Sequence, residues 1–591
     1  MITKKYSYRL IGLLFIICYF SVSPVRAQYD IVPLPQSIEL QKGEPFTLWN
    51  DLVQIVAPDD LNAEATFLQA YLKDLTGSTP SLAQKRKKGT AYIELAVSPK
   101  VTAPEGYVLT VNKKGITIAG GSAAGVFYGI QTLRKTVVNA RQSQHVTELT
   151  NKPSASSAAP PFTLLNPVVI TDAPRFSWRG MHLDCSRHFF SVAFIKKFID
   201  LLALHNMNVF HWHLTDDQGW RIEIKKWPRL TTVGSQRSGT IIGTNSDIDD
   251  GISYGGFYTQ AELREIVAYA AARHITIVPE IDMPGHMLAA LAAYPELGCT
   301  GGPYQVGHYW GVYKDVLCVG NPRVYEFVED VLTEVMDIFP SEVIHIGGDE
   351  TPAEKWVYCR KCADLNLQQL LKRPMGGAPA EVGPDGRRKM PEMTREEYEE
   401  MVRSELQPYF TNKVFNILAS KGRRALGWDE IFEGSPAETM IMSWRGSAPG
   451  AKAAEAGHDV VMTPTTHCYF DYQQVEDTEF EPSRCGGFIP IEKVYALDPA
   501  PDSLSVEARS HILGTQANLW SEYMTNEQMV EYQALPRMSA LAEVQWTQPE
   551  QKDYHAFLQR LTRLTSLFEL YHYTYAKHLW PDRQIPNRWQ F

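Results

Sequence analysis

Two adjacent carboxylates, Asp349 and Glu350, are the strongest chemical feature of the sequence. They follow the apolar run Val343–Ile346 and two glycines, Gly347 and Gly348. Consecutive residues of a regular strand point to opposite faces, so both carboxylates can serve one site only where the chain leaves strand geometry, which glycine permits. Two carboxylates in one pocket perturb each other's pKa, so that one can stay protonated while the other stays ionised. Cleavage of a glycosidic bond uses this division of labour; the alternative is a solvated acidic loop.

Polar and aromatic residues also follow seven other strand-like runs. Packing could explain polar and aromatic residues at the end of one strand, but it does not explain them at the ends of eight strands. If the eight ends meet on one rim, these residues line a common site. They are Asp184, Arg187 and His188; His211, His213, Asp216 and Asp217; Glu280, Asp282 and His286; Trp428, Asp429 and Glu430; Trp444 and Arg445; His467, Tyr469 and Asp471; and Trp520 and Glu522.

The elements that would position these residues alternate along the second part of the chain, residues 172–591. Helical patterns at Val192–His205, Gln260–Arg273, Val324–Phe339 and Arg395–Lys421 lie between strand-like runs. Eight strands alternating with helices predict a (β/α)8 TIM barrel, an α/β fold whose active sites form at the C-terminal ends of the strands. The eight runs are Trp178–Asp184, Asn208–Leu214, Ile275–Ile281, Val343–Gly347, Arg424–Trp428, Thr439–Trp444, Val460–Thr463 and Ile512–Ala517.

Residues 28–171 are expected to form a separate, small α+β domain before the barrel. The chain has 591 residues, and single cores stop growing near about 250–300 residues, so more than one domain is expected. Short strand-like runs surround helical patterns at Ala63–Leu75 and Ala123–Thr136. The Ser/Ala/Pro-rich stretch 139–161 predicts a surface insertion or linker, and Lys372–Pro391 predicts an insertion in a rim loop.

Residues 1–27 have the pattern of a secretory signal peptide. A basic start precedes the apolar run Leu10–Phe20, and Val25–Ala27 is typical of a cleavage site. The run is too short for a typical membrane span. The sequence contains no Asn-x-Ser/Thr glycosylation motif. We therefore expect an exported bacterial protein that is periplasmic, secreted or attached to the cell surface.

Composition and charge exclude several classes of protein. Hydrophobic residues make up 44% and charged residues 21%, as in globular proteins and unlike disordered chains. Removal of residues 1–27 takes away four basic residues and no acidic one, which lowers the net charge from −10 to −14. That charge argues against nucleic acid or an anionic membrane as a partner. No later stretch approaches about 18 uninterrupted apolar residues, so we expect no membrane span.

Seven cysteines remain after residue 27, too few for a disulfide scaffold in a chain of this length. In an exported protein, Cys299 and Cys318 could close a loop, and Cys359 and Cys362 could form a tight bridge. A single Cys-x-x-Cys is also half of a zinc ribbon. The sequence leaves the pairing open, and an odd count leaves at least one free thiol.

Several segments, in this order, resemble the motifs of one family. They are GVFYGIQTLRK (125–135), RGMHLDCSRHFF (179–190), NVFHWHLTDDQGWRIEI (208–224), PEIDMPGH (279–286), VIHIGGDE (343–350), GWDE (427–430), SWRG (443–446) and LWSEYM (519–524). The sequence is similar to the family 20 glycoside hydrolases, the β-N-acetylhexosaminidases, over nearly all of residues 29–575. The resemblance includes the small domain before the barrel.

The resemblance implies an exo-acting enzyme that hydrolyses terminal, non-reducing β-linked N-acetylglucosamine or N-acetylgalactosamine with retention. In this family the substrate supplies the nucleophile: its 2-acetamido oxygen attacks the anomeric carbon and forms an oxazolinium intermediate. By motif position, Glu350 would be the general acid and then the general base. Asp349 would orient the acetamido group and stabilise its positive charge, and Tyr469 would hydrogen-bond its oxygen. No metal or cofactor is implied.

The resemblance also implies a sugar pocket. Arg187 matches the arginine that binds the 3- and 4-hydroxyls, Glu522 the carboxylate at the 4- and 6-hydroxyls, and Asp471 its neighbour at the 6-hydroxyl. Aromatic faces pack on the apolar faces of a pyranose. The expected walls of the pocket are Trp428, Trp444 and Trp520. The expected supporting network is Asp216, Asp282 and His286, of which the last two are placed to tune Glu350.

Parts of the sequence are also compatible with two other functions. A metal-dependent hydrolase could use His211, His213 and His286, although no other strand end offers the remaining ligands of a two-metal site. A glycan-binding protein could keep the pocket without catalysis, although the intact carboxylate pair argues against it. The natural glycan, the preference between the two sugars and the oligomeric state, monomer or homodimer, stay open.

Overall fold

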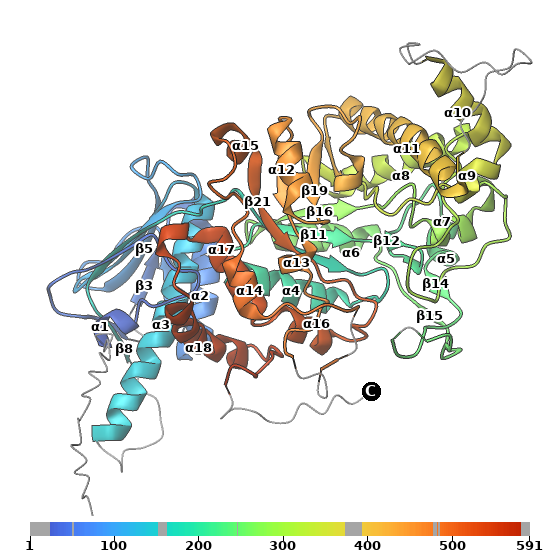
Figure 1. Cartoon of the computed structure of the whole chain (residues 1–591). Coiled ribbons are helices and arrows are strands. Elements are labelled where there is room, and N and C mark those ends of the chain that lie inside the picture. Colours follow the sequence, from blue (N-terminus) through green and yellow to red (C-terminus); the bar gives the residue numbers. More distant parts are fainter. Residues whose placement is uncertain are drawn as a thin grey trace, which may run out of the picture.

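The computed structural model describes residues 24–49, 53–77, 79–151, 162–244, 246–372, 393–476, 481–482 and 485–580. Residues 1–23 of the predicted signal peptide and nearly all of the predicted rim insertion at 372–391 lie outside these ranges. The last residues before the predicted cleavage point form a short helix, α1 (Pro24–Ala27). Two units follow it along the chain and lie side by side (Figure 1).

The first unit is built on a mixed seven-stranded sheet covered by helices. The strand order is β1-β9-β6-β7-β5-β3-β4, antiparallel from β1 to β7 and parallel from β7 to β4. Helices α2 (Asn62–Thr76) and α3 (Ala123–Asn151) pack on each other, and α3 packs on the sheet. This is the predicted small α+β unit. Its strands are β1 (Ser37–Leu40), β3 (Val53–Val56), β4 (Ser81–Ala83), β5 (Ala91–Val97), β6 (Tyr107–Asn112), β7 (Gly115–Gly120) and β9 (Val168–Asp172), with the separate pair β2 (Phe46–Trp49) and β8 (Phe162–Leu165).

Helix α3 is longer than the sequence predicts. The predicted helix stops at Thr136, and a linker is expected from residue 139, yet α3 continues to Asn151. Val137 and Ala140 are buried, and the Asn139 side chain donates a 3.0 Å hydrogen bond to the Asp30 carbonyl. The segment after 139 is polar, but it contains neither Gly nor Pro before residue 153, so nothing in it breaks a helix. The prediction of a linker from residue 139, which rested on polar composition, was therefore wrong up to Asn151.

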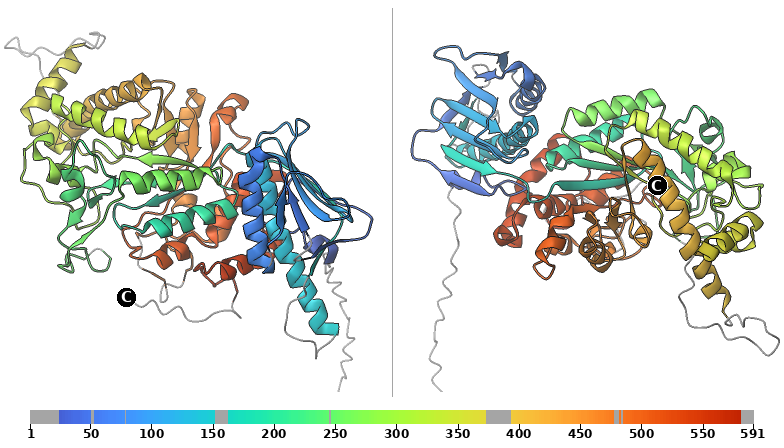
Figure 2. Two further views of the ribbon diagram at one scale, coloured as in Figure 1. Left: turned by 180° about the vertical axis from the view of Figure 1, so that it is seen from behind. Right: turned by 90° about the horizontal axis from the view of Figure 1, so that it is seen from above.

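The second unit is a closed parallel barrel, as predicted. Its eight strands lie within a few residues of the predicted runs, and the last strand pairs with the first (Figures 1 and 2). In order around the barrel they are β10 (Trp178–Asp184), β11 (Val209–His213), β16 (Thr276–Glu280), β17 (Val343–His345), β18 (Arg424–Trp428), β19 (Met440–Ser443), β20 (Val460–Met462) and β21 (Ile512–Ala517).

Helices surround the barrel, and several of them begin at a side-chain cap. The Ser191 side chain caps α4, and Thr259 with Glu262 forms a capping box at the start of α6. The predicted helices are present within about two residues of their expected ends. Those between and after the barrel strands include α4 (Val192–Leu204), α6 (Gln260–Ala271), α8 (Pro322–Ile338), α11 (Arg395–Ser420), α12 (Ser447–Glu455), α14 (Ile491–Ala496), α15 (Val506–His511), α16 (Glu527–Ala534), α17 (Arg537–Trp546) and α18 (Tyr554–Leu570).

The interior of the barrel changes from apolar to polar along the strands. On β11, alternate residues share the inner face, and they run from Val209 through His211 to His213. The apolar end is a cluster of Trp178, Val209, Val278, Val343, Leu426, Met440, Met442 and Val461, with Trp428 above it. The polar end contains His182, His211, Glu280, His345 and Gln516, all fully buried. Among the residues that face the interior, charged side chains therefore lie at only one end of the barrel.

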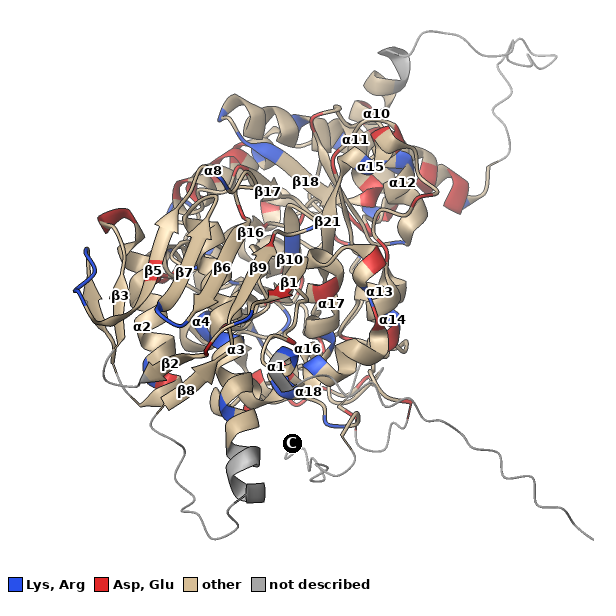
Figure 3. Ribbon diagram, turned by 90° about the vertical axis from the view of Figure 1, so that its left-hand side faces the viewer, with Lys and Arg blue, Asp and Glu red and all other residues tan. Residues whose placement is uncertain are grey.

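A buried ion pair and a tryptophan join the two units. Both terminal nitrogens of Arg179, at the start of the barrel, donate to the Glu105 carboxylate of the first unit at 2.7 and 2.9 Å. Trp546 Nε1 lies 3.0 Å from both carboxylate oxygens of Asp172. In the side view of Figure 3, basic and acidic positions are interspersed along the ribbons. Among the described helices, none combines the length and the hydropathy needed to cross a bilayer.

Candidate active site

A cavity of about 280 Å³ opens at the C-terminal ends of the barrel strands. Eleven of the twelve predicted site residues line it, and only Asp282 does not. Two further lining residues, Tyr472 and Cys485, were not predicted. Tyr472 lies next to Asp471 in the sequence, which could have indicated it, whereas nothing in the sequence marked Cys485. The predicted residues in the lining are Arg187, Asp216, His286, Asp349, Glu350, Trp428, Trp444, Tyr469, Asp471, Trp520 and Glu522.

The chain leaves strand geometry just before the carboxylate pair, as the two glycines predict. Strand β17 ends at His345, and φ is +66° at Gly347, +94° at Gly348 and +44° at Glu350. A Cβ at Gly347 would lie 1.7 Å from Asp282 Oδ1, and one at Gly348 would lie 2.3 Å from the Ile431 side chain. Both glycines are therefore required by conformation and by space. The resulting turn directs both carboxylates to one cavity.

His286 lies between the two carboxylates. Its Nε2 is 3.8 Å from Asp349 Oδ2 and 3.7 Å from Glu350 Oε2. Through its polar contact and its charge, His286 holds the pKa of Glu350 below the ordinary value. Burial, followed by the neighbouring Asp282 carboxylate, raises the pKa of Asp349 well above the ordinary value. The unliganded site therefore favours a protonated Asp349 and an ionised Glu350, the reverse of the assignment expected for catalysis.

The charge on His286 is set by two aspartates behind it. Its Nδ1 lies 3.1 Å from Asp216 Oδ1 and 3.2 Å from Asp217 Oδ2. Burial acts to lower the pKa of His286, but these carboxylates outweigh it and hold the pKa well above the ordinary value. Asp217 also accepts a 2.9 Å hydrogen bond from the Leu288 backbone. The surroundings of His286 therefore favour its protonated form, next to Asp349 and Glu350.

Asp282 lies beneath the cavity rather than in its wall. Its Oδ1 accepts a 3.1 Å hydrogen bond from the backbone N–H of Gly348, and its own backbone N–H donates to Thr215 Oγ1 at 3.2 Å. Burial is the main cause that raises the pKa of Asp282 to about 7. The carboxylate thus holds the Gly348 turn in place and adds negative potential below Asp349.

Arg187, which also lines the cavity, is held by several neighbouring side chains. Its guanidinium contacts Asp216 Oδ2 at 2.8 Å, Asp184 Oδ2 at 3.4 Å and Gln218 Oε1 at 3.1 Å. Its Cζ lies 5.2 Å from the centre of the Trp520 ring, which permits a cation–π contact. An arginine fixed in this way presents its remaining N–H groups in one orientation, as hydroxyl recognition requires.

Five aromatic rings line the cavity. Trp428 and Trp520 meet at 5.8 Å between ring centres, and Trp444 stacks on Tyr469 at 6.2 Å. Trp428 Nε1 donates a 2.9 Å hydrogen bond to Glu280 Oε1, which fixes its ring. The three tryptophans that the sequence predicted as walls thus come together from three different strand ends.

Two carboxylates, Asp471 and Glu522, face the same cavity as Arg187. Asp471 Oδ1 and Glu522 Oε2 are buried and have no hydrogen-bond partner among the residues that the structure describes. Burial raises the pKa of Asp471 well above its ordinary value, with a contribution from Glu522. Buried acceptors without a donor are costly, so these oxygens are suited to accept hydrogen bonds from a ligand.

The histidines of the metal hypothesis do not come together as one ligand set. His213 Nδ1 lies 2.6 Å and His211 Nε2 lies 3.1 Å from Glu280 Oε2, inside the barrel. Among the described residues, His286 groups instead with Asp216 and Asp282, or with Asp349 and Glu350. His211 and His213 therefore belong to the polar network beneath the site.

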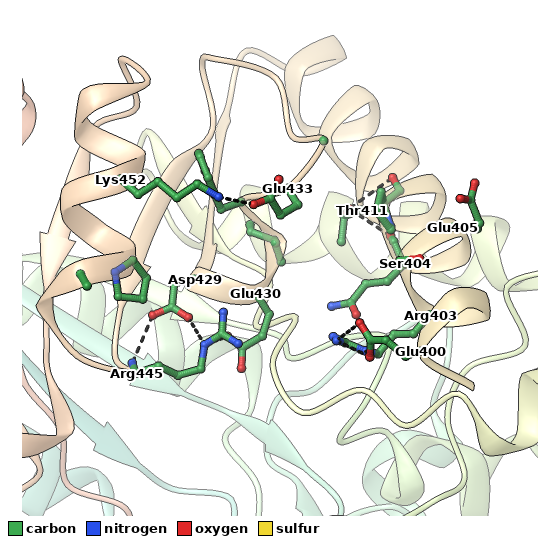
Figure 4. A pocket seen from close by; sticks show the side chains of 17 residues that line it. Glu400, Arg403, Ser404, Glu405, Thr411, Asp429, Glu430, Glu433, Arg445 and Lys452 are labelled. Atoms are coloured by element: carbon green, nitrogen blue, oxygen red, sulfur yellow. Dashed lines mark hydrogen bonds and ion pairs between the residues drawn. The ribbon is translucent and has the colours of Figure 1, made fainter. Parts of the chain in front are cut away.

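A groove of about 750 Å³ runs along the rim beside the cavity (Figure 4). Glu430 lies between the two, because Trp444 Nε1 of the cavity wall donates to its Oε2 at 2.9 Å. Burial, followed by the charge of Asp349, raises the pKa of Glu430 to about 8. The backbone N–H of Arg445 donates to Asp429 Oδ2 at 3.1 Å. The sequence placed these residues at strand ends but did not assign them a role.

Neither disulfide that the sequence left open is present among the described residues. Cys299, Cys318, Cys359 and Cys362 are free thiols that lie together, so neither Cys299–Cys318 nor Cys359–Cys362 is bonded. Sequence spacing alone could not indicate that the segments that carry them meet.

Comparison with known proteins places the chain among glycoside hydrolases. Residues 176–549 match the catalytic domain of glycosyl hydrolase family 20, and residues 28–150 match domain 2 of that family. A β-hexosaminidase of Porphyromonas gingivalis is 39% identical over 90% of this chain, which spans 62% of that relative's length. A β-hexosaminidase of Akkermansia muciniphila is 33% identical over 84% of this chain and 90% of its own.

Solved structures give the same result. An exo-β-N-acetylglucosaminidase of Vibrio harveyi, determined in complex with N-acetylglucosamine, has a TM-score of 0.76 and 31% identity, covering 94% of this chain and 79% of its own. A β-N-acetylhexosaminidase of Streptomyces coelicolor has a TM-score of 0.72 and 29% identity, covering 95% and 99% of the two chains.

Proposed function

The chain belongs to glycosyl hydrolase family 20, and we propose that it is an exo-acting β-N-acetylhexosaminidase that removes terminal, non-reducing β-linked N-acetylglucosamine or N-acetylgalactosamine from glycans. The observation that carries the proposal is the arrangement of the cavity. The pair Asp349–Glu350, the anchored Arg187, the carboxylates Asp471 and Glu522, and several aromatic rings all line one small cavity. A small cavity of this kind takes one terminal sugar rather than the middle of a chain.

We propose a retaining, substrate-assisted reaction. Glu350 donates a proton to the glycosidic oxygen as the bond from that oxygen to the anomeric carbon breaks. The 2-acetamido oxygen forms a bond to the same carbon, which gives an oxazolinium ion. Asp349 accepts a hydrogen bond from the acetamido N–H and stabilises the positive charge, and Tyr469 donates to the acetamido oxygen. Glu350 then removes a proton from water, which attacks the anomeric carbon and releases the sugar with retained configuration.

Substrate binding can reset the protonation of the pair. An acetamido N–H donated to Asp349 favours the ionised form of that carboxyl. A leaving group laid over Glu350, whose side chain is 43% exposed, buries it and favours its neutral form. Both changes move one proton from Asp349 to Glu350. In this scheme the pair Asp349–Glu350 holds one proton both before and after binding. The bound substrate determines which of the two carboxyl groups carries it.

The predicted signal peptide supports a location outside the cytoplasm. Export to the periplasm, the cell surface or the medium would give the enzyme access to extracellular glycans. Mass spectrometry of the protein from its native host tests this, since cleavage after Ala27 would leave Gln28 as the first residue. An N-terminus at Met1 in the mature protein would contradict it.

The decisive experiment compares aryl glycosides with and without the 2-acetamido group. We expect hydrolysis of the N-acetylglucosaminide and no comparable hydrolysis of the glucoside, with the β-anomer appearing first by proton NMR. Glu350→Gln should lower turnover by about 10²–10⁴-fold with a poor leaving group and much less with an activated aryl group. Equal rates on both glycosides would contradict substrate assistance, and no product in single turnover would favour the non-catalytic glycan-binding alternative.

A further inference from the structure

Four cysteines from three separate segments converge outside the barrel. Cys299 follows the short helix η2 (Pro295–Leu297), Cys318 precedes α8, and Cys359 and Cys362 flank the first residues of α10 (Arg360–Lys372). In sequence they are 19, 41 and 3 residues apart. Cys299 is half-buried and the other three are buried. No part of the proposed catalytic mechanism uses them.

Their distances fit a shared tetrahedral centre. All four sulfur atoms lie within 4.8 Å of one another. Sγ of Cys318 is 3.6 Å from those of Cys359 and Cys362, and Sγ of Cys299 is 3.9 Å from that of Cys362. A tetrahedron with Zn–S bonds of about 2.3 Å has edges of about 3.8 Å, close to these values. A disulfide needs about 2.05 Å.

The backbone around the cluster is built for this convergence. Gly320 lies against the chain beside Cys362: a Cβ there would be 2.4 Å from the Lys361 carbonyl and 2.7 Å from the Cys362 nitrogen. The Gly320 backbone also hydrogen-bonds the Cys362 sulfur. Donated N–H groups stabilise a thiolate, and so does the N-terminal end of the 13-residue helix α10, where Cys359 and Cys362 lie.

We propose that these four thiolates bind one Zn²⁺ as a structural site. Binding displaces one proton from each thiol, and zinc takes no part in redox chemistry. Four sulfur ligands in a tetrahedron, with no fifth position open, are typical of structural rather than catalytic zinc. The ion joins the loop after β16, the segment before α8 and the loop after β17.

The position of the site gives it a role in holding the rim. The loop after β16 carries His286, and the loop after β17 carries Asp349 and Glu350. Trp356, three residues before Cys359, donates a 2.9 Å hydrogen bond from Nε1 to the Leu317 carbonyl, next to Cys318. The metal would therefore brace both loops from outside the barrel, and its loss should loosen them together.

The test is metal analysis of the full chain, purified without chelators. We expect about one zinc per chain by plasma mass spectrometry, and X-ray absorption showing four sulfur neighbours at about 2.3 Å. Cys318→Ser and Cys359→Ser should lose the zinc and unfold at lower temperature. Cys185→Ser is the matched control, because Cys185 is equally buried but lies outside the group of four cysteines and accepts a hydrogen bond from Trp212. It should keep its zinc.

If the cysteine variants fail to fold, the proposal can still be tested, because exchange with Co²⁺ gives an independent readout on the unaltered chain. Exchange with Co²⁺ should produce thiolate charge-transfer bands and the intense visible bands of tetrahedral cobalt. Chelation should release the metal, after which all cysteines should react as thiols in denaturant. Protein without metal in which four of these thiols are missing would show two disulfides and overturn the proposal, and so would iron in place of zinc. None of these readouts depends on catalytic activity.

Discussion

Two sets of buried carboxylates lie at the same end of the barrel, one beneath the cavity and one in its wall. Beneath it, Glu280 has partners on both oxygens: His213 and His211 on Oε2, and His345 and Trp428 on Oε1, all within 3.1 Å. In the wall, one oxygen each of Asp349, Asp471 and Glu522 is buried without a hydrogen-bond partner among the described residues.

The difference separates the carboxylate that holds the site in place, Glu280, from those suited to accept hydrogen bonds from a ligand. Burial acts to raise the pKa of Glu280, but the histidines outweigh it and hold the pKa well below the ordinary value. Burial is not outweighed at Asp349 and Asp471, whose pKa values lie well above the ordinary range. A satisfied network contributes to folding, whereas unpaired buried acceptors cost stability and are retained where a substrate supplies the donor.

Removing Glu280 should have the largest effect, because it breaks the satisfied network. Glu280→Gln removes the carboxylate shared by three buried histidines and leaves His213 with Asp216 as its carboxylate partner, which should cost about 3–5 kcal/mol of unfolding free energy. Denaturant unfolding followed by fluorescence measures it. The control is Glu342→Gln, an exposed position at the start of the neighbouring strand, which should change stability little. Unchanged stability in Glu280→Gln would remove the distinction between the two sets.

Replacing Asp349 in the wall should affect catalysis rather than stability. Asp349→Asn should lower kcat by about 10²–10³-fold, since the stabilised charge appears only during the reaction. Its unfolding temperature should stay about the same, because the site already favours the neutral form of Asp349, which the amide matches in charge and size. Kinetics and thermal unfolding on the same preparation test both halves. A destabilised Asp349→Asn would show that Asp349 is part of the folding network instead.

Glu522 should show a smaller effect, confined to sugar recognition. A hydrogen bond to a charged group is worth about 1.5–3 kcal/mol, so Glu522→Gln should lower kcat/KM by about 10–100-fold. If the lost bond is to the sugar hydroxyls, a substrate analogue without the 6-hydroxyl should be less sensitive to the change than the parent sugar. Glu455→Gln, exposed on α12, is the control. Equal sensitivity of both substrates would place Glu522 outside the hydroxyl contacts.

Local sequence features predicted most of this organisation. The barrel strands could be predicted because short strand-like runs recur between helical patterns. The turn before Asp349 and Glu350 could be predicted because two consecutive glycines allow the chain to leave strand geometry. The end of α3 and the cysteine cluster could not be predicted. The first depends on burial of Val137 and Ala140 against the rest of the unit, and the second brings together residues separated by up to 63 positions. The protonation of Asp349 and Glu350 depends on the position of His286. That position could not be predicted from a local sequence pattern.

The smallest expected effect is a shift in pH dependence when His286 is replaced. The positive charge of His286, near both members of the pair, favours their ionised forms, so its loss disfavours deprotonation and raises both apparent pKa values of the pair. His286→Gln should therefore move both limbs of the kcat/KM profile to higher pH by about one unit. Reduced activity with an unmoved profile would mean that His286 acts only through packing. His555→Gln, exposed on α18, should leave the profile unchanged. A shift toward lower pH would contradict the proposed sign of the interaction between His286 and the pair Asp349–Glu350.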